Sequence, residues 1–359
     1  MPMDKKINTG LIGFGVGGQV FHAPILTAVE GLLLKKIRAV RPEQIEAAGK
    51  RYPGSQLVAH AEEIIEDPAI DLVVIATPNK FHLPLAKQAL EAGKHVVVDK
   101  PFTITAADAD SLILLAEKKQ KILSVFQSRR FDSDFRTVQQ IIRTGALGEI
   151  VEMESRYDRF RNFLKPGAWR EADEPGSGLL YDLGSHLIDQ ALTLFGLPLA
   201  VTACILRQRK QARVDDNFEL ILHYPLLKVT LKAGMLVREA LPRFVLLGEQ
   251  GSFVKKGMDV QEEALKAGLT PATHPDWGAE PPEIWGTLNT TVNGIHILGK
   301  TESATGDYRI FYQNIYRAIT GQDPLLVTAE QARNTIRIIE LAWQSEQEKR
   351  TLDYTPFRN

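Results

Sequence analysis

The stretch TGLIGFGVGG, residues 9–18, joins an apolar run to three glycines spaced G-x-G-x-x-G, at Gly13, Gly15 and Gly18. The apolar run predicts a strand, and the residues that follow predict a helix over 18–30. In this fingerprint the first glycine allows a tight turn, the second lets backbone approach a pyrophosphate, and the third lets the helix pack on the strand, with the helix N-terminus facing the anion. The stretch therefore predicts a dinucleotide-binding loop; a glycine-rich turn in another kind of α/β protein is the alternative.

The first third of the chain repeats this alternation of strand and helix. Further apolar runs are LLKKIRAV, IDLVVIATP, HVVVDKP and ILSVF, and helical patterns lie between them. Strict alternation is typical of a doubly wound parallel sheet with helices on both faces. We therefore predict an α/β Rossmann domain over residues 1–126 that binds a nicotinamide dinucleotide.

The pattern changes after about residue 127. The segments IVEMESRYDRFR, AVTACILRQRK, NFELILHY, LKVTLKAGML and RFVLLGEQGSFVKK read as longer, partly alternating strands. They predict a large, mainly antiparallel sheet with one open face in a second, α+β domain over residues 127–359. Residues 257–306 read as irregular, and TAEQARNTIRIIELAWQSEQEK predicts a capped amphipathic helix. Two domains suit a chain of 359 residues.

Composition narrows the classes of partner. A formal net charge of -1 gives no electrostatic reason to bind nucleic acid or an anionic membrane, so a small, near-neutral ligand is favoured. Cys204 is the only cysteine, which excludes an intrachain disulfide and a thiolate metal cluster. Asp182, His186 and Asp189 are the one group whose spacing suits metal ligands, and no second histidine accompanies them, so we expect no metal. With no signal peptide and no apolar run of membrane-spanning length in the sequence, we expect a cytoplasmic protein.

The end of the second predicted strand bears on the choice of cofactor. An acidic residue here would bind the ribose 2′-hydroxyl of NAD, but the strand ends in Val40 followed by Arg41. A guanidinium suits the 2′-phosphate of NADP through charge-assisted hydrogen bonds. The sequence therefore favours NADP; the alternative is that Arg41 is a solvated loop residue and Glu43 serves NAD.

Two later strand ends carry polar residues at the same predicted sheet edge. Pro78, Asn79 and His82 follow one buried strand and are candidates for lining the dinucleotide, or for a local turn alone. Asp99 and Lys100 follow the next, and Pro101 restricts the turn. A lysine held there can hydrogen-bond a substrate hydroxyl and favour its alkoxide; a lysine that extends into solvent is the alternative reading.

GSGLLYDLGSHLIDQ, residues 176–190, sets Asp182 and His186 four positions apart on a predicted helix. A helical projection gathers its leucines on one side and Asp182, His186, Asp189 and Thr193 on the other. A carboxylate one turn from a histidine can orient the imidazole and stabilise its protonated form, as general acid–base catalysis requires. A polar stripe that faces water remains the other interpretation.

The chain resembles, over nearly its whole length, the glucose-fructose oxidoreductase/inositol dehydrogenase/rhizopine-catabolism family of NAD(P)-dependent oxidoreductases. The matching pieces are GFGVGG, VVVDKP where the family usually has Glu-Lys-Pro, and GSGLLYDLGSHLID for its D-x-x-x-H helix. The segments FHAP, QSRRFDSDF, WRE and GSFVKKGMD are similar to the branch that contains NADP-dependent scyllo-inositol dehydrogenases. This resemblance implies an oxidoreductase of the two-domain form described above.

The resemblance also implies roles for matching positions. Lys100 would bind the reacting oxygen and assist proton movement, His186 would be the general acid/base, and Asp182 would bind substrate and tune His186. Asp99 would contact the nicotinamide ribose, although it is shorter than the family's glutamate. The remaining implied positions are Arg129, Trp169 and Arg170 along the cofactor and pocket, and Tyr157 and Arg159 toward substrate hydroxyls, or packed on an exposed sheet face.

Two classes of function follow. The first is an NADP-dependent dehydrogenase or reductase that moves hydride between nicotinamide and a secondary hydroxyl or ketone of a cyclic polyol or sugar; oxidation of a glycoside is its variant. The second is a non-catalytic nucleotide sensor, against which the joint presence of Lys100, Asp182 and His186 weighs. Because an open sheet face would expose a large apolar patch, we also expect a homodimer or homotetramer through the C-terminal sheet.

Overall fold

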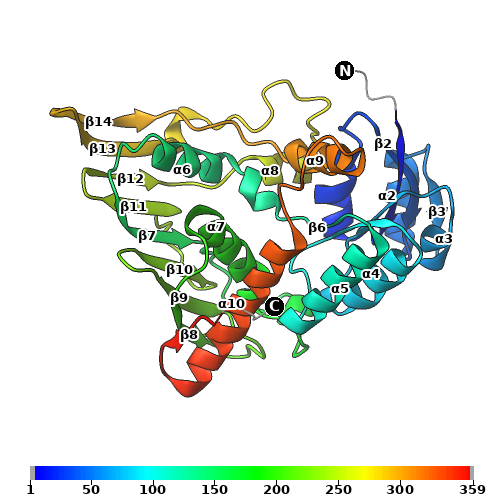
Figure 1. Ribbon diagram of the computed structural model, residues 1–359, viewed down its shortest axis with the longest axis horizontal. Helices are drawn as coiled ribbons and strands as arrows, with labels where there is room; N and C mark the ends of the chain where they lie inside the picture. The colour runs from blue at the N-terminus through cyan, green and yellow to red at the C-terminus, as the bar shows by residue number, and fades with distance from the viewer. Residues whose placement is uncertain (1–4, 356–359) are drawn as a thin grey trace. The chain divides into compact units, whose positions relative to one another are not determined.

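The computed structural model describes residues 5–355 and divides the chain into two compact units (Figure 1). The first contains the described residues up to Phe131 together with Val260–Trp277 and Asp307–Arg333. The second contains Asp132–Asp259, Gly278–Gly306 and the described residues from Asn334 onward. These units group residues that contact one another and do not mark where a folding domain begins in the chain. The domain boundary between residues 126 and 127 therefore stays a prediction.

The first unit is built on a six-stranded parallel sheet with the order β3-β2-β1-β4-β5-β6. Its strands are β1 (Ile7–Ile12), β2 (Leu32–Arg38), β3 (Gln56–Val58), β4 (Leu72–Ile75), β5 (His95–Val98) and β6 (Leu123–Val125). The connections contain α1 (Ala23–Leu26), α2 (Pro42–Arg51), α3 (Glu62–Ile65), α4 (His82–Glu91) and α5 (Ala106–Lys119). The doubly wound prediction is confirmed. The sequence reading missed β3, because three residues are too few to show a period.

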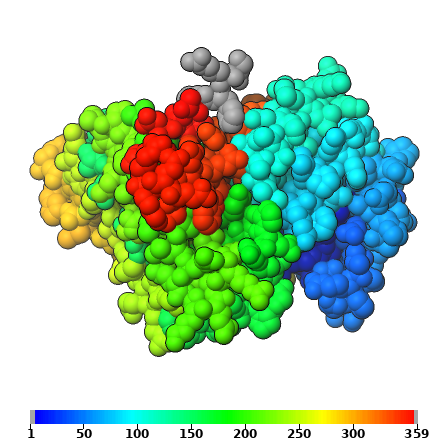
Figure 2. All heavy atoms as spheres, turned by 90° about the horizontal axis from the view of Figure 1, so that it is seen from below, coloured from blue at the N-terminus to red at the C-terminus, as the bar shows by residue number. Residues whose placement is uncertain are grey.

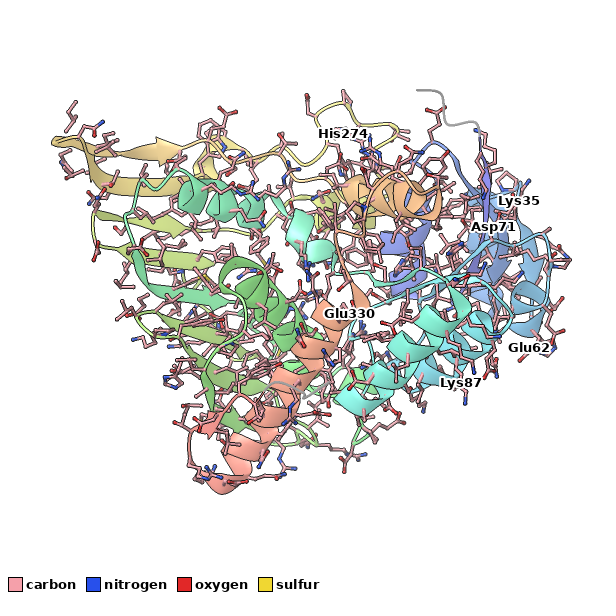
Figure 3. All side chains as sticks on the ribbon, viewed as in Figure 1. Lys35, Glu62, Asp71, Lys87, His274 and Glu330 are labelled. Carbon is pink, nitrogen blue, oxygen red and sulfur yellow. The ribbon has the colours of Figure 1, made fainter. Side chains whose placement is uncertain are left out.

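Burial explains why the strands of this sheet read as unbroken apolar runs. Every residue of β4 is completely buried, as are the three valines of β5. Charged side chains lie on the outer elements instead: Figure 3 shows Glu62 on α3 and Lys87 on α4 at the periphery of the unit. A parallel strand covered on both faces has no position at which a polar side chain reaches water.

Register brings three strand ends of this sheet to one edge. Ile12 of β1 pairs with Ile75 of β4, and Ile75 pairs with Val98 of β5. Because the strands are parallel, the residues that follow them, from Gly13, Ala76 and Asp99, begin side by side. Doubly wound folds bind ligands at this carboxyl edge.

Two later segments of the chain complete the first unit. They contribute α8 (Gln261–Lys266) and α9 (Arg309–Ile319). The guanidinium of Arg129 donates one hydrogen bond to the Tyr308 hydroxyl, over 3.0 Å, and pairs with the Glu262 carboxylate. The Trp277 indole donates to Gln261 over 2.8 Å. The two contacts of Arg129 attach segments that lie 133 and 179 positions away in the sequence, and the indole contact joins the two ends of one of them.

The second unit contains a nine-stranded mixed sheet with the order β14-β13-β12-β11-β7-β10-β9-β8-β15, in which only β7 and β10 pair in parallel. Its strands are β7 (Ile150–Arg156), β8 (Ala200–Leu206), β9 (Asn217–His223), β10 (Lys228–Gly234), β11 (Phe244–Gly248), β12 (Gly251–Lys255), β13 (Gly286–Val292), β14 (Ile295–Thr301) and β15 (Leu352–Asp353). The predicted large, mainly antiparallel sheet is confirmed.

Helices cover one face of this sheet. α6 (Ser133–Arg143) and α7 (Ser185–Phe195) lie over the same side in Figure 1. Phe135 of α6 packs on Phe244 of β11, with ring centroids 6.4 Å apart. The last helix, α10 (Ala329–Glu348), runs along green segments of this unit in Figure 2, and its Ser345 hydroxyl accepts from the amide of Ala203 on β8 over 3.1 Å. The sequence predicted α10 at residues 328–349. Within residues 5–355, no helix has both the length and the apolar character needed to cross a membrane.

Two expectations for the second sheet are wrong. RFVLLGEQGSFVKK is not one strand but the hairpin of β11 and β12, which turns at Glu249 and Gln250. Residues 257–306 are not irregular throughout, since they contain α8 and the hairpin of β13 and β14. The turn of that second hairpin is Asn293-Gly294, with positive φ at both residues. Asn-Gly between alternating segments is a strong hairpin signal, so this hairpin was predictable.

The expected apolar patch on the open face is also wrong for the central strands. Side chains there form ion pairs between neighbouring strands: Lys228 with Glu152 at 3.0 Å, and Lys232 with Glu154 at 3.5 Å and with Glu219 at 3.4 Å. Opposite charges placed across neighbouring strands stabilise a sheet that one layer of helices leaves open.

Candidate active site

The glycine loop has the geometry that the fingerprint predicts. Gly13 has φ +105°, and a Cβ added there would lie 2.5 Å from the carbonyl oxygen of Ala76. The Cβ of any residue at Gly18 would collide with the carbonyl of Gly13, so the dinucleotide-binding helix, a π-helical turn over Gly17–His22 that continues into α1, packs directly on the turn. At Gly15, by contrast, no described residue comes within 4 Å of an added Cβ. Gly15 thus leaves open space at the start of a helix, which fits the approach of a pyrophosphate.

Arg41 lies where the sequence placed it, immediately before α2. Its guanidinium Nε is 3.2 Å from the Glu43 carboxylate, and both side chains are 65% exposed. A pair this exposed contributes little to stability and can exchange partners. Arg41, which would bind NADP, and Glu43, which would bind NAD, are therefore in contact with each other. Once the pair separates, Arg41 suits the 2′-phosphate and Glu43 suits the 2′-hydroxyl.

Asn79, in the connection after β4, and His82, the first residue of α4, are both buried. One ring nitrogen of His82 lies 2.9 Å from the Thr77 carbonyl, and the other lies 2.9 Å from the Pro101 carbonyl. Burial lowers the pKa of His82, although the nearby Asp99 carboxylate opposes this shift. The ring therefore joins the loops after β4 and β5, and a role of His82 in cofactor binding would act through the position of those loops.

Asp99 and Lys100 begin the loop after β5, and the Lys100–Pro101 peptide is cis. Burial disfavours ionisation of Asp99, but interaction with His22 and the charge of Lys100 outweigh it and hold the pKa of the carboxyl below its ordinary value. His22 and Tyr312 are buried polar neighbours that the sequence reading did not single out. Only their proximity in three dimensions identifies them.

Arg129 is held by protein groups on two sides, namely Tyr308 and Glu262. Although burial raises the pKa of Glu262, the Arg129 charge and the Lys266 ammonium bring it down to about 2. A carboxylate with so low a pKa stays ionised and keeps this pair intact at any physiological pH. The position of Arg129 along the cofactor stays a prediction, and the structure gives it a structural partner as well.

In the second unit, Asp182 and His186 belong to one continuous helix. A π-helical turn over Leu180–Gly184 precedes α7, which contains His186 and Asp189. Both of these residues are buried, whereas Asp182 is partly exposed and Thr193 is exposed, so only the middle of the polar stripe is shielded from water. Turns of π-helix occur frequently at functional sites.

The helix brings several other predicted residues together. The Arg170 guanidinium lies 3.0 Å from the Asp182 carboxylate and 4.6 Å from the centre of the Trp169 ring. The rings of Tyr157 and His186 lie 6.2 Å apart in an edge-on arrangement. Arg159 is exposed, and its amide donates to the Gly234 carbonyl over 2.9 Å. Its predicted contact with substrate has no further support.

Arg243 is a residue of this region that the sequence reading missed. Its guanidinium lies 3.8 Å from the centre of the Tyr157 ring, and it donates to Gln190 of α7 over 2.7 Å. The same group contacts Ser155 of β7. One buried cation thus fixes α7 relative to the strand that leads to Tyr157. No sequence pattern marks it, because Gln190 and Ser155 lie 53 and 88 positions before it in the chain.

Asp215 contacts the start of the helix that contains Asp182 and His186. Its carboxylate accepts a hydrogen bond from the amide of Leu180 over 2.6 Å, and it occupies the space where a side chain at Gly178 would lie. Burial raises the pKa of this carboxyl to about 6, against the lowering effect of its backbone hydrogen bonds. No group of three or more histidine, cysteine, aspartate or glutamate side chains in the described part of the chain has a metal-binding arrangement.

A doubly wound sheet with this glycine loop, followed by a second unit with a histidine–carboxylate helix, defines a nucleotide-binding oxidoreductase. Two family descriptions match the chain: "Oxidoreductase family, NAD-binding Rossmann fold" over residues 7–127 and "Oxidoreductase family, C-terminal alpha/beta domain" over residues 139–354. The chain belongs to this family, that of glucose-fructose oxidoreductase, inositol dehydrogenase and the rhizopine-catabolism proteins.

Individual relatives agree with that assignment. Scyllo-inositol 2-dehydrogenase (NADP(+)) IolW of Bacillus subtilis is 41% identical over 97% of both chains. The solved structure of yvaA from Bacillus subtilis has a TM-score of 0.93 and 39% identity, and covers 98% of this chain and 99% of its own. D-glucoside 3-dehydrogenase of Escherichia coli is 28% identical over 54% of this chain and 55% of its own.

Proposed function

We propose that the protein is an NADP-preferring dehydrogenase that acts on a secondary hydroxyl of a cyclic polyol, in the manner of a scyllo-inositol dehydrogenase. The observation that carries this proposal is the retention of Lys100, Asp182 and His186 in a chain that is 41% identical to a scyllo-inositol 2-dehydrogenase over nearly its full length. Burial of His186 supports it further, because the alternative of a solvated helix face would leave this imidazole exposed.

The residues around the glycine loop fit the cofactor. Gly13, Gly15 and Gly18 would form the turn that holds the pyrophosphate. The open space beside Gly15 is where the pyrophosphate would approach the main chain. Arg41 would bind the 2′-phosphate once its contact with Glu43 is exchanged. NADP, when bound, supplies a nicotinamide ring that takes hydride from the carbon of an alcohol or returns it to a ketone. Pro78, Asn79 and His82 would shape the wall of this site.

The chain's own groups would manage the proton. Lys100 would donate a hydrogen bond to the reacting oxygen and so favour its alkoxide form. His186 would take the hydroxyl proton as general base, and return it in the opposite direction as general acid. Asp182 would stabilise the imidazolium that results, while its contact with Arg170 fixes the carboxylate. Tyr157, beside His186, would meet the substrate hydroxyls.

A glycoside or sugar dehydrogenase is a second candidate, favoured by the partial match to a D-glucoside 3-dehydrogenase. A nucleotide-sensing regulator is a third, and retention of a buried histidine with its carboxylate neighbour speaks against it, because a sensor needs no proton transfer. We also propose self-association through the sheet of the second unit and a cytoplasmic location.

A substrate panel tests this function. Reduction of NADP and of NAD would be followed by nicotinamide absorbance with inositols, aldoses and simple glycosides, using wild type, Lys100→Ala and His186→Ala. We expect turnover of an inositol with NADP, and a loss of about 100-fold or more in kcat in either variant with little change in NADPH affinity. Exclusive use of glycosides would favour the second candidate. Tight NADPH binding without turnover of any panel member would favour the sensor.

A further inference from the structure

We propose that Asp99 is an internal brace, which fixes the loop after β5 against the dinucleotide-binding helix and so positions Lys100, and that it is not a nicotinamide-ribose contact. This inference rests on the proposed function, in which Lys100 binds the reacting oxygen. It makes His22 and Tyr312 positioning residues of that reaction. Each of these residues lies in the first compact unit.

One carboxylate oxygen of Asp99 is hydrogen-bonded within its own loop, and the other lies against the glycine loop. Oδ1 accepts a hydrogen bond from the amide of Lys100 over 2.8 Å and lies 3.6 Å from Nε2 of His22. Oδ2 lies so close to Gly17 that a Cβ added at that glycine would be 2.9 Å away. Gly17 is not one of the three fingerprint glycines, and the Asp99 carboxylate explains why this position also lacks a side chain.

His22 connects that carboxylate to α9. The imidazole is fully buried, and its Nδ1 lies 2.6 Å from the hydroxyl of Tyr312. Burial raises the pKa of Tyr312 well above its ordinary value, so the hydroxyl stays protonated and is able to donate to Nδ1. When that hydroxyl donates, Nε2 is the ring nitrogen that carries a proton toward Asp99. Within residues 5–355 that nitrogen has no hydrogen-bond partner, and the charged group beside it is the Asp99 carboxylate, 3.6 Å away.

The length of the Asp99 side chain fits this arrangement. The family resemblance has glutamate at this position, whose additional methylene would carry the carboxylate farther from the main chain. Here that extension would meet Gly17 or the His22 ring, which is itself packed against Phe126 with centroids 4.5 Å apart. The residues Asp99, Gly17 and His22 therefore depend on one another. An aspartate is also too short to reproduce a ribose contact that a glutamate makes.

A double-mutant cycle tests the brace. His22→Phe keeps an aromatic ring beside Phe126 but removes both nitrogens, and Asp99→Asn keeps the size and removes the charge. We expect each change to lower kcat about 10-fold while the Kd for NADPH, from fluorescence titration, stays within about 3-fold of wild type. The double variant should lose no more than the worse single variant, because both act through one contact. A ribose contact predicts instead that Asp99→Asn weakens NADPH binding and that the two effects add.

Milder variants separate positioning from a general loss of structure. His22→Gln retains an amide donor for Asp99 and should recover most of the kcat lost in His22→Phe. Tyr312→Phe should lower kcat, whereas Tyr316→Phe should not. Tyr316 is a matched control because it is equally buried on α9 and its hydroxyl donates to the Lys5 carbonyl over 3.0 Å. Equal effects of Tyr312→Phe and Tyr316→Phe on kcat would show that the Tyr312 hydroxyl does not help to position Lys100 through His22.

Asp99→Glu gives the sharpest contrast. A brace predicts a lower kcat and a melting temperature lower by roughly 3–6 °C, because the longer side chain cannot fit. A ribose contact predicts that the family's own residue binds NADPH as well as, or better than, aspartate. Melting temperatures of the single and double variants, with and without NADPH, need no turnover. A wild type that oxidises no polyol would refute the proposed function, while additive melting shifts would refute the brace.

Discussion

At the scale of single residues, the choice of cofactor depends on which partner Arg41 takes. Glu43 holds its guanidinium at 3.2 Å, and the exposure of both side chains means that a 2′-phosphate can replace the carboxylate. Arg41→Ala should raise the Kd for NADPH about 10-fold or more and narrow its difference from NADH. Glu43→Gln should tighten NADPH binding by a few-fold, since the competing charge is gone. Titrations of both variants with both nucleotides provide the measurement, and an unchanged preference in Arg41→Ala would remove this residue from recognition.

Gly15 provides a second prediction at this scale. Because an added Cβ meets no described atom within 4 Å, Gly15→Ala should fold with a melting temperature within about 2 °C of wild type. The same methyl group would occupy the space assigned to the pyrophosphate, so NADPH affinity should fall about 10-fold or more. Gly13→Ala is the contrasting variant: its positive φ and the Ala76 carbonyl should make it unstable. A Gly15→Ala protein that binds NADPH normally would disprove the assignment of this loop.

Among the elements, the helix of Asp182 and His186 depends on Asp215. The folded-state pKa of this carboxyl is about 6, above its ordinary 3.8, so the folded protein holds the proton more tightly than the unfolded chain. Its contribution to stability is therefore present below about pH 4 and is lost as pH rises through about 6, by at most about 3 kcal/mol. Asp215→Asn keeps an acceptor for the Leu180 amide and should remove this part of the pH dependence.

Chemical denaturation at pH 5 and at pH 7.5 measures the part of this loss that falls above pH 5, about 1.4 kcal/mol in the free energy of unfolding. Relative to wild type, Asp215→Asn should gain stability at the higher pH. Asp173→Asn, which changes an exposed carboxylate in the same unit, is the control and should follow the wild-type curve. If wild type and Asp215→Asn keep a constant difference between the two pH values, the carboxyl does not titrate in this window.

The elements also show what local pattern can predict. The strands of the first unit were evident because β4 and β5 are buried on both faces and read as unbroken apolar runs. β3 was missed for lack of length, and β13 and β14 because a segment rich in Gly, Pro and Thr resembled irregular chain.

The candidate site divides in the same way. Strand ends and helical spacing singled out Lys100, Asp182 and His186 as candidates, and their roles stay predictions. His22, Asp215 and Arg243 have partners distant in sequence, which no local pattern can show.

For the molecule as a whole, the open face of the second sheet determines how copies could associate. Our sequence-based reason for association was an apolar patch, but Lys232 lies between Glu154 and Glu219, and Lys228 pairs with Glu152. A face whose charges are already paired can be covered by a partner without leaving a buried charge unsatisfied. Around these pairs, Leu206 and Leu247 are exposed apolar side chains that a partner would bury. A symmetric interface of two copies remains the arrangement we expect.

Lys232→Glu tests that expectation, because it places a third carboxylate between two others. In an isolated chain water screens this repulsion, but beneath a partner it would persist, so the variant should dissociate at protein concentrations where wild type does not. Light scattering after size-exclusion chromatography gives the masses. Lys35→Glu, the same charge reversal at an exposed position on β2 of the first unit (Figure 3), should leave the mass unchanged. A wild type that is monomeric at tens of micromolar, or a Lys232→Glu variant that associates as wild type does, would show that this face is not the interface.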